Sequence, residues 1–421
     1  MARRYFGTDG VRGVVGQDLT RDLVQRLGRA AALWSGRGRV FVGRDTRESG
    51  PELEEAFAQG VSSAGGNAVL AGVLPTPAVA LLALDLGAVI SASHNPPQYN
   101  GVKLFDADGR KLSDRSEEEV EALLDAPPAE TPGAIDRVGV ATDSYLEHIV
   151  ERFGSDLHGL RIAVDCANGA YSGIAPQAFE RLGAEVAPVA AAPDGENINV
   201  GCGATDLSLL QRVVTEGRYD LGVAFDGDGD RMLAVDADGN AVDGDQILAI
   251  LALALDVDLV AVTVMTNLGF HRLMGERGIR VLVTDVGDRY VLEALHEHGG
   301  LLGGEQSGHI IYLRDHVTGD GLAAALLLCG ALEGRTLQEA AAAMPRYPQV
   351  QENIAVTDKR LPPSLLAEVE QINAELGERG RVLVRASGTE PVVRVLAEAE
   401  GFQEARSLCG TISDLVRREL G

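Results

Sequence analysis

The feature that most constrains the fold of this chain is a recurring order of short segments. A run rich in β-branched residues is followed by a Gly or Asp turn and then by a stretch rich in Ala and Leu. This order appears at 39–74, 160–189 and 258–285. Strands that alternate with helices are typical of βαβ units, which build largely parallel sheets covered on both faces. We therefore predict three similar α/β domains, each with a mixed, mostly parallel sheet.

The last part of the chain has a different order. It predicts a helix at 364–377, strands at 381–385 and 392–397, and a helix at 402–418. The two strands are joined by a short loop that contains Gly, which favours antiparallel pairing and a smaller C-terminal α+β domain. Turn-forming residues cluster near 126–136, 238–244 and 343–351. The expected domains are therefore 1–135, 136–240, 241–346 and 347–421.

The charge balance limits the partners of the protein. The chain has 37 basic and 62 acidic residues, a formal net charge of −25. A field of this sign repels nucleic acid and anionic membranes. It also repels an anionic metabolite, so a phosphate site must be built locally from arginine side chains and backbone N–H groups.

Cysteine spacing and hydropathy predict a cytoplasmic protein. The four cysteines are far apart and form no C-x-x-C pair, as expected of reduced thiols. The N-terminus lacks the apolar segment of a signal peptide. The most apolar stretch, 247–265, is interrupted by Asp256 and Asp258, and we predict a buried helix followed by a strand rather than a membrane span.

The first chemical motif is AVISASHNPPQYNGVK, residues 88–103. An apolar strand ends in a turn with two serines, at the carboxyl end where open α/β sheets assemble their sites. Because Pro96 restricts Asn95, we expect an extended, exposed loop. A serine here is a candidate nucleophile or phosphate ligand, although ordinary turn chemistry explains the same residue types. A serine hydrolase is disfavoured because G-x-S-x-G is absent around Ser93.

The second motif places Asp226, Asp228 and Asp230 alternately with glycine between two predicted strands. Three carboxylates this close resist ionisation unless a cation lies among them. Arg231 and Ala237 stand where an EF-hand needs Gly and Glu. We therefore predict a Mg²⁺ site, since only three side-chain ligands leave positions for water or a phosphate oxygen. A solvated Asp-Gly hairpin is the alternative.

Two further motifs carry polar groups. In an extended loop, Glu305, Ser307 and His309 of GGEQSGHI would share one face, where they suit sugar hydroxyls, although a structural role for the histidine is also common. The loop after the strand at 381–385 offers arginine side chains, hydroxyls and free amides, which together form a nest for phosphate. Its candidate residues are Arg385, Ser387, Gly388, Thr389 and Arg394.

Several other arginines lie near these motifs. Arg12, Arg44 and Arg47 accompany the first motif, and ion pairs with surface carboxylates are the default expectation for them in so acidic a chain. Arg289 is expected in a Gly-Asp turn after a strand, at the ligand-facing end.

In their order along the chain, these motifs resemble those of the α-D-phosphohexomutases. The resemblance rests on FGTDGVRG, ISASHNP with NGVK, DGDGDR, GGEQSGH and RASGTEP, and covers residues 6–398. GEQSGH, with TGDG (318–321) and NINVGCGAT (197–205), is most similar to the bacterial branch that acts on a hexosamine phosphate.

The resemblance implies four domains around a central cleft, each contributing one loop. It implies that Ser93 is the nucleophile, carried as a phosphoserine, and that one Mg²⁺ per chain is bound by Ser93, Asp226, Asp228 and Asp230. Glu305 and Ser307 would contact the sugar, Arg289 would join the substrate site, and the loop at 385–394 would bind the distal phosphate. Roles in proton transfer and charge stabilisation fall on Arg12, Lys103, Arg231 and His309.

The implied activity interconverts glucosamine 6-phosphate and glucosamine 1-phosphate, on the route to UDP-N-acetylglucosamine and the cell wall. Glucosamine or glucose 1,6-bisphosphate would serve as intermediate or activator. A phosphomannomutase/phosphoglucomutase specificity is the alternative, and a non-catalytic phosphosugar- or Mg²⁺-binding protein is a more distant one. A homodimer is compatible with the sequence.

Lysine is rare in this chain. It occurs only at Lys103, Lys111 and Lys359, while every other basic residue is arginine. A lysine can lose its proton when its pKa is lowered, whereas an arginine cannot. Lys103 is therefore predicted to act as a general base.

Overall fold

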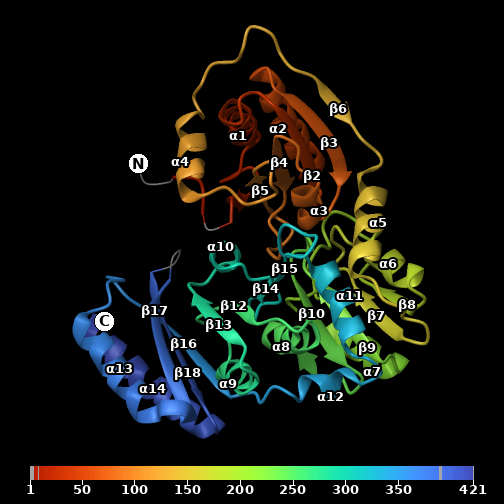
Figure 1. Ribbon diagram of the computed structural model, residues 1–421. Coiled ribbons are helices and arrows are strands. Elements are labelled where there is room, and N and C mark those ends of the chain that lie inside the picture. The colour runs from red at the N-terminus through yellow and green to blue at the C-terminus, as the bar shows by residue number, and fades with distance from the viewer. Residues whose placement is uncertain (1–3, 8, 388–390, 421) are drawn as a thin grey trace. The chain divides into compact units, whose positions relative to one another are not determined.

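The computed structural model of the chain describes residues 4–7, 9–387 and 391–420 (Figure 1). Its contacts divide the chain into two compact units. The first contains the chain up to Val264 together with Arg280–Ala342, and the second contains Met265–Ile279 together with the chain from Ala343. Each unit is described by itself below.

The first unit begins with an α/β domain built on a mixed sheet. In the described residues the strand order is β1-β5-β4-β2-β3-β6. β2 runs parallel to β3 and β4, whereas β5 runs antiparallel to β4 and β1. The elements are β1 (Val11–Val14), α1 (Arg21–Trp34), β2 (Arg39–Arg44), α2 (Gly50–Ser63), β3 (Asn67–Val73), α3 (Thr76–Leu81), β4 (Leu86–Ile90), β5 (Tyr99–Phe105), α4 (Asp114–Ala122) and β6 (Ile135–Arg137).

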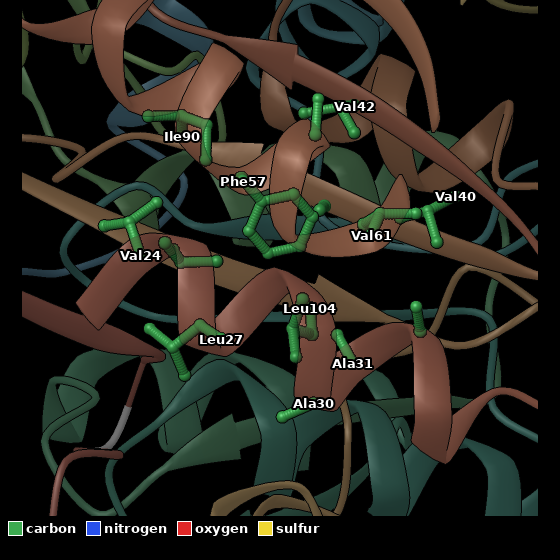
Figure 2. Packing of buried hydrophobic residues seen from close by; sticks show 14 of the residues in the cluster. Val24, Leu27, Ala30, Ala31, Val40, Val42, Phe57, Val61, Ile90 and Leu104 are labelled. Carbon is green, nitrogen blue, oxygen red and sulfur yellow. The ribbon is translucent and has the colours of Figure 1, made fainter. Parts of the chain in front are cut away.

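The core of this domain lies between the sheet and helices α1 and α2. Phe57 of α2 is fully buried among aliphatic side chains from α1 and from the central strands (Figure 2). α1 begins after Thr20, whose hydroxyl accepts the Leu23 N–H at 3.2 Å. Its residues Val24, Leu27 and Ala31 recur at helical spacing and face this core.

A second sheet has the strand order β11-β10-β9-β7-β8 in the described residues. β7 is parallel to β8 and β9, and β10 is antiparallel to β9. The elements of this domain are α5 (Ala141–Phe153), β7 (Arg161–Asp165), α6 (Ala175–Arg181), β8 (Glu185–Val189), α7 (Ser208–Gly217), β9 (Leu221–Phe225), β10 (Met232–Asp236) and β11 (Ala241–Val242).

The third sheet has the order β13-β12-β14-β15 in the same described part of the chain. β12 is parallel to β13 and β14, and β15 is antiparallel to β14. The apolar stretch at 247–265 forms α8 and β12, as predicted. The elements are α8 (Gly244–Ala254), β12 (Leu259–Thr263), α9 (Leu268–Arg277), β13 (Arg280–Thr284), α10 (Asp288–His298), β14 (Leu302–Gly304), β15 (Ile310–Tyr312), α11 (Gly321–Ala331) and α12 (Leu337–Ala341).

The second unit contains an antiparallel sheet with the order β16-β18-β17 in its described residues. The antiparallel pairing of β17 with β18 is the predicted one, whereas β16 falls in a region expected to be a turn-rich boundary. The elements are β16 (Gln349–Ala355), α13 (Pro363–Leu376), the short 3₁₀ helix Gly377–Arg379, β17 (Gly380–Ala386), β18 (Val392–Ala399) and α14 (Phe402–Leu420).

Helix α9 belongs to this second unit although it comes from the middle of the chain. The side chain of Asn267 donates to the Tyr347 carbonyl at 2.9 Å and accepts the Tyr347 N–H at 3.0 Å. Arg381 of β17 donates to the Thr266 carbonyl at 2.5 Å. These bonds tie the start of α9 to the C-terminal segment.

The predicted fold class is confirmed: three α/β domains with mixed sheets precede a smaller α+β domain. All four cysteines are buried and free of disulfides. Among the described residues, no helix combines the length and the apolar character that crossing a bilayer requires.

Candidate active site

Ser93 follows the carboxyl end of β4, where the sequence predicts a site. The loop is not extended, because turns close from Asn95 N–H to Ala92 O and from Tyr99 N–H to Pro96 O. Pro96 and Gln98 are exposed as expected, but Ser93 itself is only 1% exposed. Its Oγ donates to Asp226 Oδ2 at 2.5 Å. His94 Nδ1 lies 3.2 Å from the same Oγ, and burial, with Arg231 and Arg12, lowers the pKa of His94 to about 4.

The three aspartates after β9 converge on one point. One carboxylate oxygen from each lies within 4.8 Å of the others, and all three side chains are buried. Burial, followed by the carboxylates of Asp230 and Asp228, raises the pKa of Asp226 well above its usual range. The cluster is therefore not the solvated hairpin that the sequence left as an alternative.

Glycine makes this convergence feasible at two positions. Gly229 adopts φ +79°, and a Cβ there would lie 2.3 Å from the ring of Tyr171. A Cβ at Gly227 would lie 2.7 Å from the carbonyl oxygen of Ser93. The aspartate loop and the serine loop thus touch through backbone that leaves no room for a side chain.

The donor set of this cluster fits a hard divalent cation. Asp228 Oδ1 and Asp230 Oδ1 are buried and have no hydrogen-bond partner in the part of the chain that the structure describes. Buried carboxylate oxygens without a donor are costly unless a cation binds them. The oxygen-only ligands match the preference of Mg²⁺.

Lys103 of β5 is the cation already present at the cluster. Its Nζ lies 2.7 Å from Asp228 Oδ2, 3.1 Å from Asp230 Oδ2 and 3.1 Å from Asp9 Oδ2. Burial alone would lower the pKa of Lys103, but the three carboxylates outweigh burial and raise this pKa well above its usual range. These contacts favour the protonated ammonium, and the role of Lys103 as a general base stays a prediction.

A ring of alternating charges extends from Lys103. Asp9 contacts Lys111 at 2.6 Å, and Lys111 contacts Asp288 at 2.6 Å. Asp288 Oδ2 lies 3.4 Å from His309 Nε2, and His309 Nδ1 lies 3.8 Å from Asp230 Oδ1. Burial would lower the pKa of His309, but the carboxylates of Asp288 and Asp230 raise it.

The segment from Glu305 to His309 is a tight hairpin between β14 and β15, not an extended loop. The Gly308 N–H donates to Glu305 O at 3.0 Å, and the Glu305 N–H donates to His309 O at 3.0 Å. Glu305 and His309 are therefore buried while Ser307 is exposed, so the expectation that all three share a face is wrong. Burial raises the pKa of Glu305, whose Oε1 accepts the Gly287 N–H at 3.1 Å.

The arginines of the first unit have different environments. Arg12 on β1 pairs with Asp9, and Arg231 Nε lies 3.9 Å from Asp230 Oδ1, so both border the cluster. Arg289 lies in helix α10 rather than in the preceding turn, and it pairs with Asp114 and with Glu117 at 3.3 Å. Its part in substrate binding stays a prediction.

The candidate phosphate loop lies in the second unit. Arg385 of β17 and Arg394 of β18 are directly opposite each other in the antiparallel register. Ser387 is buried, and its carbonyl accepts a hydrogen bond from Lys359 Nζ at 2.9 Å. Gly388 and Thr389 lie outside the described residues.

Sequence reasoning missed five residues of the first-unit site. Thr76 at the start of α3 donates through Oγ1 to Asp228 Oδ2 at 2.6 Å, and Asn199 donates to Ser93 O at 2.9 Å. The other three are Asp9, Lys111 and Asp288 of the charge ring. The only available signals were the rarity of lysine and the presence of Asp9, Asn199 and Asp288 in segments noted for other residues.

Family models match almost the whole chain. They are phosphoglucomutase/phosphomannomutase alpha/beta/alpha domain I at residues 3–130, domain II at 143–239, domain III at 243–347 and the C-terminal domain at 339–415.

Curated relatives match at similar length. The phosphoglucosamine mutase of Pelotomaculum thermopropionicum is 48% identical, with 98% of each chain covered. That of Thermobifida fusca is 48% identical, with 99% of each chain covered.

Solved structures share the fold. A phosphoglucomutase/phosphomannomutase family protein from Burkholderia thailandensis gives a TM-score of 0.84 at 26% identity, with 97% of each chain covered. The Aspergillus fumigatus N-acetylphosphoglucosamine mutase, in complex with GlcNAc-6P and magnesium, gives 0.71 at 19% identity, covering 99% of this chain and 96% of that one. The chain belongs to the phosphoglucomutase/phosphomannomutase family of α-D-phosphohexomutases and is most like the bacterial phosphoglucosamine mutases.

Proposed function

We propose that the chain catalyses the interconversion of glucosamine 6-phosphate and glucosamine 1-phosphate. The observation that carries this proposal is the placement of one serine hydroxyl, Ser93 Oγ, 2.5 Å from the first of three convergent aspartates. The curated relatives that match at 48% identity over nearly the full chain are phosphoglucosamine mutases, which favours an amino sugar over mannose or glucose.

The reaction moves a phosphoryl group between the two ends of one sugar. With Ser93 carried as a phosphoserine, its Oγ–P bond breaks while a new bond forms from phosphorus to the free hydroxyl of the substrate. The substrate hydroxyl loses its proton as this bond forms, and Ser93 Oγ takes up a proton as it leaves. The product of this half-reaction is a 1,6-bisphosphate. The bisphosphate then turns end for end. Its other phosphoryl group is transferred to Ser93 Oγ, and the sugar oxygen that is released takes up a proton to become the product hydroxyl.

The residues around Ser93 are proposed to stabilise the charge of the phosphoryl group and to transfer protons in these steps. Arg12, Arg231 and the protonated Lys103 supply positive charge for the equatorial phosphate oxygens. A guanidinium does not titrate in the working range, so His309 is the proposed proton carrier for the sugar hydroxyl, and Lys103 is the alternative carrier. Glu305 and Ser307 are proposed to bind the sugar.

Asp226, Asp228 and Asp230, with a phosphoserine oxygen, would hold a Mg²⁺ ion. When bound, the ion withdraws charge from the bridging oxygen of the transferring phosphoryl group. The orphaned Oδ1 atoms of Asp228 and Asp230 support this proposal.

The second unit is proposed to bind the phosphate that is not being transferred. Arg385 and Arg394 are directly opposite each other on two paired strands, so their side chains leave the same face of the sheet. Two guanidinium groups on one face can donate paired hydrogen bonds to a phosphate. Arg385, Ser387 and Arg394 would therefore hold the distal phosphate, with Gly388 and Thr389 as the remaining proposed ligands.

The deciding experiment labels Ser93. Incubation with glucose 1,6-bisphosphate is expected to add one phosphate to the intact protein, and peptide mapping is expected to place it on Ser93. Ser93→Ala should abolish both label and turnover while keeping the thermal midpoint, and Ser144→Ala, an exposed serine on α5, should change neither. A label on another residue contradicts the proposal.

Comparison of kcat/KM for glucosamine, glucose and mannose phosphates distinguishes the sugar specificities.

A further inference from the structure

Arg47 occupies a position that the proposed chemistry does not yet explain. It follows β2, and its side chain is 0% exposed, so it is not the surface ion-pair partner expected from the sequence. Its guanidinium points into the serine loop. Nη1 donates to the carbonyls of Pro96 at 2.5 Å and Tyr99 at 2.9 Å, and Nη2 donates to those of Ser93 at 2.9 Å and Asn95 at 2.8 Å.

The same guanidinium also binds a buried carboxylate, that of Asp45. Arg47 Nε donates to Asp45 Oδ2 at 2.9 Å, and the Ser91 hydroxyl donates to the same oxygen at 2.6 Å. The Ser91 hydroxyl in turn accepts the N–H of Ser93 at 2.9 Å. Both the amide and the carbonyl of Ser93 are therefore bound within one buried network that begins at Arg47 and Asp45.

This network holds Ser93 in an unfavourable backbone conformation. Ser93 has φ +53°, in the left-handed region that L residues with a Cβ rarely adopt. Such a conformation persists only where the surroundings fix it. The fixed backbone places Oγ against Asp226, so its direction depends on the groups that bind the Ser93 peptide units.

We propose that Arg47 is a positioning residue for phosphoryl transfer at Ser93. Its five N–H donors are arranged in one plane, which allows a single side chain to bind four carbonyls and one carboxylate. A lysine ammonium has three donors around one atom and cannot span the loop from Ser93 to Tyr99. This inference rests on the proposed role of Ser93 as the phosphate carrier.

Arg47→Lys tests the inference in the full-length protein, with Arg44→Lys as the matched control. Arg44 lies in the same segment but contacts the Glu54 carboxylate at 3.5 Å and the Asp45 carbonyl at 3.2 Å. For Arg47→Lys we expect kcat to fall about a hundredfold with KM nearly unchanged, because an ångström of misplacement costs about this much. Hydrogen exchange is expected to speed up in the peptide that covers residues 91–100 and not elsewhere. Arg44→Lys should match the wild type in both.

Two results would overturn the inference: an Arg47→Lys protein with wild-type exchange and kcat, or equal losses in both variants.

If Arg47→Lys does not fold, Ser91→Ala tests the inference instead, because this variant removes one hydroxyl oxygen of the network and leaves the guanidinium in place. Ser91→Ala should show the same two effects at smaller size, and wild-type behaviour would reject the network. Absence of mutase activity in the wild type would refute the proposed function, while the exchange comparison would still test the loop.

Discussion

Asp228 shows at the residue scale how a buried carboxylate constrains chemistry. Its Oδ2 binds Thr76 and Lys103, whereas its Oδ1 is buried without a partner in the described residues. Such asymmetry is expected of a group that completes its bonding with a ligand. The pattern D-G-D-G-D predicted that the three carboxylates come together, whereas the burial and bonding of each oxygen are seen only in the structure.

Magnesium is therefore expected to stabilise the folded protein through Asp228. A ligand at a hundred times its Kd adds about 2.7 kcal/mol to the free energy of unfolding, which raises the thermal midpoint by a few degrees. Differential scanning fluorimetry in MgCl₂ and in EDTA measures this shift. Asp228→Asn should lose the shift, and Asp143→Asn, an exposed aspartate on α5, should keep it. Equal shifts in both variants would exclude the triad as the metal site.

Asp165 gives the clearest expectation for pH. Burial raises its pKa to about 6, despite hydrogen bonds from the N–H groups of Gly203 and Ala167. Between the unfolded pKa near 4 and this value, the folded state binds the proton and the unfolded state does not, so stability falls as pH rises. The loss across this window is about 3 kcal/mol, at 1.4 kcal/mol per pKa unit. In urea titrations at pH 4 and pH 6.5, the wild type should lose about 3 kcal/mol more than Asp165→Asn.

At the scale of elements, strand ends were predictable and the turns between them were not. β4 and β9 end where the apolar runs end, which places Ser93 and Asp226 correctly. The hairpin after β14 was missed because its shape depends on paired backbone bonds between Glu305 and His309, and residue types do not reveal these. β16 was missed because its neighbouring prolines and glutamines suggested a boundary, while pairing with β18 overrides this local signal.

Asp320 couples helix α11 to the aspartate loop. It accepts the N–H groups of Leu322 and Ala323, at 2.9 and 3.0 Å, and the hydroxyls of Tyr145 and Tyr171, at 2.7 and 2.8 Å. The next residue, Gly321, donates its N–H to Gly229 O at 3.0 Å. This capping aspartate thus supports the backbone that carries Asp228 and Asp230.

Asp320→Ala is expected to destabilise the protein by about 2–4 kcal/mol. Loss of the cap accounts for about 1 kcal/mol. The hydroxyls of Tyr145 and Tyr171 lie 2.7 Å apart, so one can donate to the other, and the single buried donor left without an acceptor accounts for about 1–3 kcal/mol. Tyr145→Phe, which removes one donor and leaves the cap, should cost about 1 kcal/mol. Denaturant titration of both variants measures the difference. A loss of similar size in the two would show that the cap contributes little.

At the scale of the whole molecule, the order of motifs predicted the fold class and most of the site. The charge ring could not be predicted in this way. Asp9, Lys111 and Asp288 come from segments separated by a hundred residues or more. Only in the folded chain does Lys111 Nζ lie 2.6 Å from a carboxylate oxygen of Asp9 and 2.6 Å from one of Asp288. Their alternation matters because isolated buried charges would be strongly unfavourable.

Unfolding of the whole chain is expected to occur in more than one step. Trp34 is the only tryptophan, and it lies on α1, where its indole N–H donates to Glu119 at 3.1 Å. Its fluorescence therefore reports on the first domain, while the second unit has a separate apolar core. Chains with several cores commonly violate two-state behaviour. Fluorescence and far-UV circular dichroism should give different midpoints in urea, and superimposable curves would contradict this expectation.

The origin of helix α9 also limits how such a gene can evolve. Because Met265–Ile279 packs with the chain beyond Ala343, no single crossover can exchange the C-terminal unit by itself between two homologous genes: a crossover before residue 265 also transfers residues 280–342 of the first unit. A chimera joined near residue 343 would match the recipient's helix with the donor's sheet. Lineages are therefore expected to inherit these two stretches together, or to repair their shared surface by compensating substitutions.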